Sequence, residues 1–364
     1  RHIDQWLRLF ETGHPAGRIT LARLSQSLPV HAIHRFGLDP LLLVYLSGRQ
    51  HWSVRSPSHY TALPAARIEK AVAELLHQWN QAITQHLRWP PGSPSVPPAW
   101  WSEILASPHG PQRPPRRPGQ AWYGSRCVPK PALFRRFTSA LRSTIHTLQQ
   151  PRNLAHLIAY HNLFTLYAFQ AWEFGTLTRP QAIPQVNWHT VDYEGRHALI
   201  ADKDTRFEEP RLEAIPPTAR ALTTSLLHEA NPSMLRALRA HSRVDVRGME
   251  RLAESFFFLI DPATTRIEPL SPSAITRLLT RHPALAALYP YPPNVHRHLI
   301  STLLFNRFHA PAELRNYLMG HKHYGHEPFH VYACTDLPRV HALLSDLLER
   351  CLKSLGFTVI PWIL

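Results

Sequence analysis

The chain has 364 residues, with 40 Lys and Arg against 25 Asp and Glu, so its net charge is +15 before any of its 25 His are counted. Such an excess favours a polyanionic partner bound with steep salt dependence, but it does not separate an enzyme from a passive binding protein. The three Cys lie far apart, no secretory signal is visible, and no run of about eighteen apolar residues exists. A disulfide-rich secreted domain and a membrane span are therefore disfavoured, and we expect a cytoplasmic protein.

The first third of the chain predicts a small helical domain followed by a linker. Residues 1–88 carry apolar residues at helical spacing, most clearly over 65–89. Residues 89–130 are rich in proline and unsuited to helix. This segment is predicted to be an extended linker or insert along a DNA backbone, although an ordinary solvated loop fits equally well. Its basic residues, proposed as DNA contacts, are Arg113, Arg116 and Arg117.

The middle of the chain predicts a buried helix and then a small antiparallel sheet. The apolar run 163–172 ends in the sequence Gly-Thr-Leu-Thr-Arg-Pro at 175–180. Alternating runs at 186–192 and 196–203, separated by a Glu-Gly turn, predict a β-hairpin. The stretch 208–217 is the expected third strand, with prolines limiting its length. Lys203 and Arg206 follow the second run of the hairpin.

A helix is predicted from Val295, with Asn294 as its N-cap. Arg297 and His298 then fall in the first turn. A cation there opposes the helix dipole at a cost of roughly 0.3–1 kcal/mol. A bound anion would turn this conflict into a favourable site. The alternative is a solvated first turn whose Arg reaches away from the helix axis.

The next predicted helix begins with Pro311 at position N1 and ends with Gly320 as its C′ residue, so that His321 emerges just beyond it. Tyr332 follows on or near a loop. The histidines between 321 and 330 match no closed zinc spacing, so we predict no metal site. A long amphipathic helix over 340–355 follows, and then the apolar tail 357–364, which we predict to pack on a neighbouring protomer, with packing on its own domain equally open.

These motifs resemble those of the tyrosine recombinase (phage integrase) superfamily. Arg297-His298, the Leu-Met-Gly-His stretch 318–321 and Tyr332 match its C-terminal boxes. Asn294 and the Gly-His-Glu-Pro stretch 325–328 are similar to a variant branch with Asn-x-x-Arg-His. The stretch ending in Arg179 is similar to the Thr-Gly-Leu-Arg box, and Lys203 matches the hairpin Lys. Three departures are Asn294 in place of His, an interval from His321 to Tyr332 that is about two residues longer than the common form, and Ala182 in place of the usual acidic residue.

The resemblance implies a covalent mechanism in which Tyr332 attacks a DNA phosphate and forms a 3′-phosphotyrosyl bond. Arg179 and Arg297 would bind the non-bridging oxygens, and Lys203 would protonate the leaving 5′-oxygen. His321, supported by His298, would assist at the phosphate, and Asn294 would donate a hydrogen bond. His296 and Arg206 are further proposed DNA contacts. Neither a metal nor a nucleotide cofactor is required.

The resemblance also implies a mainly α (α+β) architecture. It comprises a helical DNA-binding domain at 1–88, the linker at 89–130 and a mostly helical catalytic domain with a small antiparallel sheet at 131–364. The expected protein is a site-specific recombinase, an integrase or resolvase of a mobile element. It would act as a homotetramer on double-stranded DNA sites in the cytoplasm, associated with the nucleoid, with accessory proteins as possible partners.

Three alternatives to this prediction stay open. Tyr317 and Tyr324 compete with Tyr332 for the nucleophile, and Arg206 competes with Lys203. A type IB topoisomerase-like nicking and closing enzyme would share the same chemistry. A DNA-binding protein with a decayed active site is compatible with Asn294 and Ala182.

Overall fold

The computed structural model describes residues 29–47, 59–86, 122–125, 128–179, 186, 190–192, 194, 196–200, 211–241, 255–289, 294–320 and 336–363. The chain divides into two compact units, Arg1–Gly124 and Ser125–Leu364. The boundary lies inside the segment 89–130 that the sequence predicts to be a linker. Each unit is described by itself.

The N-terminal unit is a small helical unit with one strand pair. Its elements are α3 (Pro40–Ser47), β1 (Ala62–Pro64), α5 (Ala65–His86) and β2 (Trp122–Gly124). β1 and β2 pair antiparallel, and Ala32, Leu43 and Leu75 form an apolar cluster between the helices. The helix predicted over 65–89 is confirmed as α5. β2 lies within the predicted linker segment and belongs to this unit through its pairing with β1.

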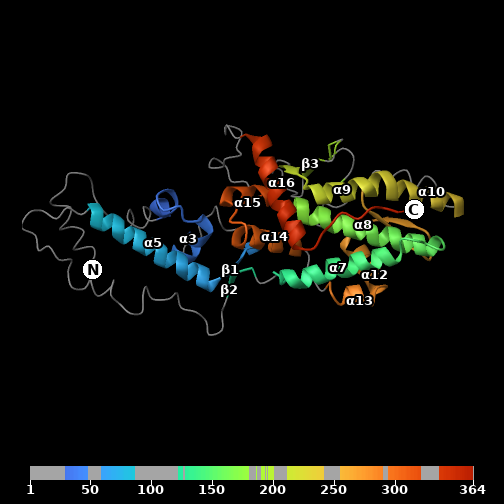
Figure 1. Ribbon diagram of the computed structural model, residues 1–364, viewed down its shortest axis with the longest axis horizontal. Helices are drawn as coiled ribbons and strands as arrows, with labels where there is room; N and C mark the ends of the chain where they lie inside the picture. Colours follow the sequence, from blue (N-terminus) through green and yellow to red (C-terminus); the bar gives the residue numbers. More distant parts are fainter. Residues whose placement is uncertain are drawn as a thin grey trace, which may run out of the picture. The chain divides into compact units, whose positions relative to one another are not determined.

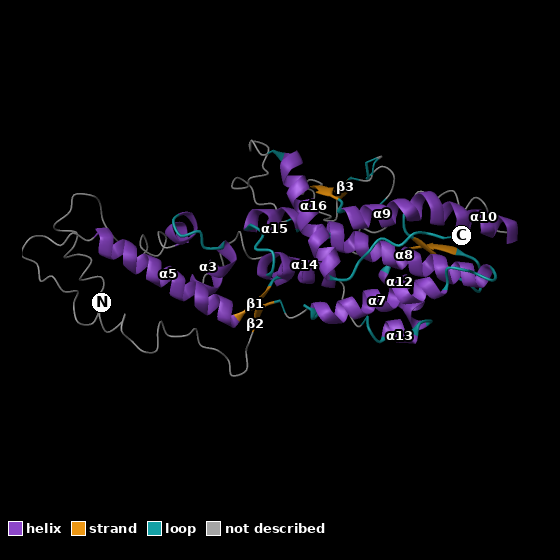
Figure 2. Ribbon diagram, in the orientation of Figure 1, coloured by secondary structure: helices purple, strands orange, loops and turns teal. Residues whose placement is uncertain are grey.

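The C-terminal unit is mostly helical, and its strands are short (Figure 2). Its helices are α7 (Pro131–Thr147), α8 (Leu154–Thr176), α9 (Pro217–Ser225), the π-helical turn η3 (Leu226–Ala230), α10 (Asn231–His241), α12 (Pro272–Thr280), α13 (Pro283–Ala286), α14 (Val295–Asn306), α15 (Ala312–Leu318) and α16 (Leu337–Ser354). Its strands are β3 (His197–Ile200), β4 (Arg211–Ala214), β5 (Phe258–Ile260) and β6 (Ile267–Pro269). The predicted mainly α class with small antiparallel sheets is confirmed.

Helix α8 is the centre of this unit (Figure 1). Every residue from Tyr160 to Thr176 is buried, and α8 contacts α7, α9, α10, α14, α16 and β5. A helix that is buried on all sides needs partners for its polar groups. Asn162 accordingly bonds both backbone groups of Ile260, at 2.7 and 2.9 Å, and His161 lies 2.9 Å from Asn231. Among the helices of the described ranges, none is long and apolar enough to span a bilayer.

The sheet of β3 and β4 pairs in the order that the sequence predicts. β3 pairs antiparallel with β4, which is the predicted third strand, in the register His197↔Ala214. In the described part of the run 186–192, only an isolated bridge from Val191 to Ala198 forms. The Asp192 carboxylate accepts hydrogen bonds from the backbone N–H groups of Arg196 and His197 at 2.6 and 2.9 Å. These bonds close the turn, and the backbones of Thr190 and Asp192 also bond those of Leu199 and His197, so the described residues agree with the predicted hairpin.

The C-terminal tail packs on its own unit, which is the alternative that the sequence left equally open, and docking on a neighbouring protomer in a DNA-bound assembly stays a prediction. Phe357, Ile360 and Trp362 are buried. Trp362 stacks on Tyr160 of α8, with ring centroids 4.2 Å apart. The Tyr167 hydroxyl donates to the carbonyl of Thr358 and accepts from its N–H, both at 3.0 Å. The aromatic side chains of α8 thus supply the apolar surface and the hydrogen-bond partners that the tail needs.

We expect Trp362→Ala to destabilise the protein by about 3 kcal/mol, because it removes a large side chain from a packed stack. The control is Val359→Ala in the same tail, where the side chain is 54% exposed and the expected change is within about 0.5 kcal/mol. Urea unfolding followed by circular dichroism measures both. Equal stability losses in the two variants would show that the tail does not belong to the core.

Candidate active site

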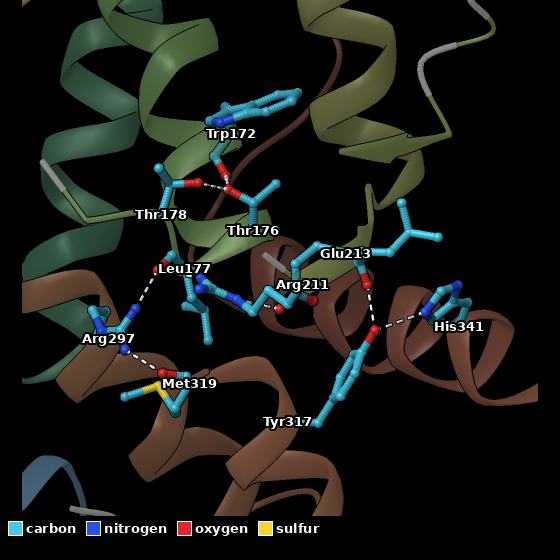
Figure 3. A network of polar contacts seen from close by, with 11 residues as sticks. Trp172, Thr176, Leu177, Thr178, Arg211, Glu213, Arg297, Tyr317, Met319 and His341 are labelled. Atoms are coloured by element: carbon cyan, nitrogen blue, oxygen red, sulfur yellow. Dashed lines mark hydrogen bonds and ion pairs between the residues drawn. The ribbon is translucent and has the colours of Figure 1, made fainter. Parts of the chain in front are cut away.

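Arg297, in the first turn of α14, joins three segments that are distant in sequence (Figure 3). Its side chain is 0% exposed. Nη1 donates to the carbonyl of Leu177 at 2.5 Å, and Nη2 donates to the carbonyl of Met319 at 2.6 Å. The planar guanidinium suits two acceptors at a fixed spacing. The end of α8, the start of α14 and the end of α15 therefore meet at one side chain.

The turn that follows α8 has an unusual backbone. Leu177 is the C-cap of α8 and adopts the left-handed conformation, with φ 54°. For a residue other than glycine this costs roughly 1–2 kcal/mol. The Thr176 hydroxyl donates to the carbonyl of Trp172 at 2.9 Å and lies 2.7 Å from the Thr178 hydroxyl, which fixes both sides of the turn. Arg179 follows in the loop and is partly buried.

Arg211, on β4, is a second buried arginine at the same point. It is 4% exposed, its Nε donates to Glu213 at 2.7 Å, and its Nη2 lies 3.5 Å from the carbonyl of Leu177. Gly320 lies against it: a Cβ on Gly320 would be 2.9 Å from Arg211 Nη1. The sequence analysis missed Arg211 and Glu213, because a charged pair on a strand is typical of a solvated surface.

The residues around Arg297 are only partly as predicted. α14 begins at Val295, as expected, but Asn294 is in the left-handed conformation with φ 66° and its side chain makes no capping bond. Its Oδ1 is buried and has no hydrogen-bond partner within the described ranges. The predicted N-cap role of the Asn294 side chain is therefore wrong. His298 Nδ1 lies 2.7 Å from the Ser125 hydroxyl, and His298 is 6% exposed.

His296 is 1% exposed and lies against Glu173 of α8, with Nδ1 3.3 Å from Oε1. An interior position does not fit the DNA contact predicted for His296. Burial raises the pKa of Glu173 to about 8, and the hydrogen bond from Gln170 opposes this rise. At neutral pH the carboxyl is therefore protonated, and its contact with His296 is not an ion pair.

The end of α15 agrees with the prediction at Gly320. Met319 is the C-cap, and Gly320 follows at C′ with φ 62°, although the helix begins at Ala312 with Pro311 just before it rather than at N1. Tyr317 on this helix donates to the carbonyl of Leu212 and lies 3.0 Å from His341 Nε2. Burial and the nearby Glu213 raise the pKa of the Tyr317 phenol. A phenol held in this way is poorly suited to act as a nucleophile.

Several predicted site residues lie outside the described ranges. They are Arg113, Arg116, Arg117, Lys203, Arg206, His321 and Tyr332, together with the competing Tyr324 and the histidines that follow His321. Within the described ranges, no group of three or more His, Cys, Asp or Glu side chains is placed to hold a metal ion. Of the predicted catalytic residues, the described ranges include Arg179, Asn294, Arg297 and His298.

No protein-family model matches the chain, and no curated protein is significantly similar to it in sequence. The function is therefore inferred from the sequence motifs and from the geometry around Leu177.

The raised pKa of the Glu173 carboxyl predicts that the stability of the folded protein depends on pH. Its pKa is about 8 in the folded protein against an ordinary 4.5, so between these values the folded state holds a proton that the unfolded state releases. Stability should therefore fall as pH rises from 5 to 8, and Glu173→Gln should remove about 3 kcal/mol of that fall. Urea unfolding at several pH values measures this difference. The exposed Glu313→Gln variant should follow the wild type; a Glu173→Gln curve parallel to that of the wild type would contradict the assignment.

Proposed function

We propose that this chain is a tyrosine-type site-specific DNA recombinase that cuts and rejoins DNA through a 3′-phosphotyrosyl intermediate. One observation carries the proposal. Arg297 bonds Leu177, two residues before Arg179, and Met319, two residues before His321. The first of the three boxes that resemble the superfamily lies 120 residues from Arg297 and the third lies 22 residues from it, yet both are bonded to this one guanidinium, as a shared phosphate site requires.

Backbone conformation gives independent support. When Thr176-Leu177-Thr178-Arg179 is aligned with the Thr-Gly-Leu-Arg box, the box Gly falls on Leu177, and Leu177 adopts the left-handed conformation that glycine accepts most readily. Gly320, in the Leu-Gly-His box, is left-handed as well. The backbone at Leu177 is thus compatible with the glycine that the box has at this position.

In the proposed reaction the Tyr332 oxygen attacks the phosphorus and displaces the 5′-oxygen, which Lys203 protonates. Reversal by a 5′-hydroxyl of another strand re-forms the phosphodiester and frees the tyrosine. Arg179 binds a non-bridging oxygen where charge develops. Arg297 is the second arginine proposed to bind a non-bridging oxygen, and its two carbonyl bonds order the loops on either side of it. His321 and His298 act beside the same phosphate.

The proposal includes the setting of the reaction. The substrate is double-stranded DNA with paired recombination sites of a mobile element, and the active assembly is a homotetramer. The net charge of +15 supports a DNA partner. Arg113, Arg116, Arg117 and Arg206 are the proposed backbone contacts, and the location is the cytoplasm, at the nucleoid.

A second candidate is a DNA-binding protein whose site no longer cleaves. The observation that favours it is the full burial of Arg297 against two carbonyls, with the Asn294 Oδ1 buried beside it, which resembles a structural clamp as much as a phosphate ligand. A type IB topoisomerase-like enzyme would share the covalent step, but it would relax supercoiled plasmid as a monomer without paired sites.

We expect the wild-type protein to form a denaturation-resistant adduct with DNA and Tyr332→Phe to form none, because only a hydroxyl can form the phosphotyrosyl bond. The DNA is a pool of duplexes selected for binding to the protein, each nicked at a different position so that cleavage is trapped. Adducts are measured on denaturing gels. Tyr317→Phe is the matched control and should still form adduct.

Three results distinguish the candidates. Adduct from Tyr332→Phe would contradict the nucleophile assignment. No adduct from any protein, on DNA that is bound, would favour the binding protein. Adduct together with relaxation of plasmid DNA that lacks paired sites would favour the topoisomerase-like enzyme.

A further inference from the structure

Arg211 is not one of the residues that the motifs identify, yet it contacts the segments that contain Leu177 and Gly320. It leaves β4 and enters the space between the end of α8 and the end of α15 (Figure 3). Nη2 is 3.5 Å from the carbonyl of Leu177, and the guanidinium lies against Gly320. Leu177 precedes Arg179 by two residues, and Gly320 directly precedes His321.

The Arg211–Glu213 pair is an unusual choice for a buried position. Arg211 is 4% exposed and Glu213 is 0% exposed, with Nε 2.7 Å from Oε1. Removing both charges from water is expensive, and apolar residues of similar volume are often equally good or better for stability. Global stability alone therefore does not explain the pair. The geometry of the pair explains it better. Glu213 binds the Nε side of the guanidinium, and Nη2 faces the Leu177 carbonyl.

Gly320 is part of the same arrangement. Its φ of 62° favours glycine, and a Cβ would be 2.9 Å from Arg211 Nη1 and 3.5 Å from Cζ. The missing side chain is therefore what lets the guanidinium approach the backbone from which His321 emerges. The sequence assigned Gly320 to the end of a helix and to the Gly-His box, and it did not predict this contact with Arg211.

We propose that Arg211 is a positioning residue: with its charge balanced by Glu213, it holds the Leu177 turn and the Gly320 backbone at a fixed separation, and so fixes the position from which Arg179 meets the phosphate. This inference rests on the proposed recombinase function. Arg211 is too buried to touch DNA in this arrangement and acts through the backbone of two neighbours. Errors of about 1 Å in such positioning can slow a reaction by about a hundredfold.

The test replaces both residues of the pair, because Arg211→Met alone would leave the buried Glu213 carboxylate without its positively charged partner. The double variant Arg211→Met with Glu213→Leu keeps the volume and removes both charges. Arg211→Lys keeps the charge but loses the fork. The matched control is Arg277→Met with Glu268→Leu, an exposed Arg–Glu pair between α12 and β6. Each protein is assayed on the selected nicked duplexes for melting temperature, half-saturating concentration and rate of adduct formation at saturation.

For the Arg211→Met, Glu213→Leu variant we expect a melting temperature within about 5 °C of wild type and half-saturation within about threefold. Its adduct rate at saturation should fall by about thirtyfold or more. Arg211→Lys should fold and stay at least about tenfold slow, because one ammonium cannot serve the carboxylate and the carbonyl together. The control pair should react at the wild-type rate.

Two outcomes overturn the inference separately from the proposed function. If the wild type reacts and the double variant reacts equally fast, the positioning role is wrong while the recombinase stands. If the double variant does not fold, Arg211→Lys decides, and a wild-type rate from that variant shows that Arg211 only balances Glu213. If the wild type forms no adduct on DNA that it binds, the proposed function fails and the inference fails with it.

Discussion

The carbonyl oxygen of Leu177 accepts from one buried arginine at 2.5 Å and faces a second at 3.5 Å. A backbone carbonyl has two lone pairs, so one oxygen can serve donors that arrive from different directions. Leu177 lies at the C-cap of α8 in the left-handed conformation, where the backbone leaves the helical path. Through this acceptor the end of α8 is joined to the start of α14 and to strand β4, and Arg297 extends the connection to the end of α15.

The position of that acceptor is set by the helix that carries it. A helix buried from Tyr160 to Thr176 cannot shift without moving the helices packed around it, so its end is a rigid reference point. Three polar residues along α8 are held in the same way by neighbouring elements: His161 by Asn231, Asn162 by Ile260 and Glu173 by His296. A phosphate site of the proposed kind needs this rigidity, because arginines that bind it well must not have to reorganise.

The sequence allowed the long elements to be predicted, because α8, α14 and α16 have apolar patterns that only a buried or amphipathic helix satisfies. It also placed Gly320 beyond the end of α15, since a left-handed C′ residue is usually glycine. It did not reveal the left-handed Leu177, because leucine rarely adopts that conformation, and it assigned Asn294 to helix capping although asparagine adopts the left-handed conformation more readily than most residues. Arg211 was missed for a different reason: its meaning lies in contacts with residues 34 and 109 positions away. The apolar sequence of the tail likewise indicates that the tail must pack on another surface, but it does not indicate which surface.

The tail has one more consequence, for the order in which the molecule can be made. Chains emerge from the ribosome N-terminus first, and domains fold as their residues become available. Helix α8 is complete some 180 residues before Trp362, which stacks on it and helps to bury it. Until that residue is made, the aromatic face around Tyr160 stays uncovered. The nascent C-terminal unit therefore exposes an apolar surface through most of its synthesis. We expect chaperones and proteases to bind chains that end before Trp362 in preference to complete chains.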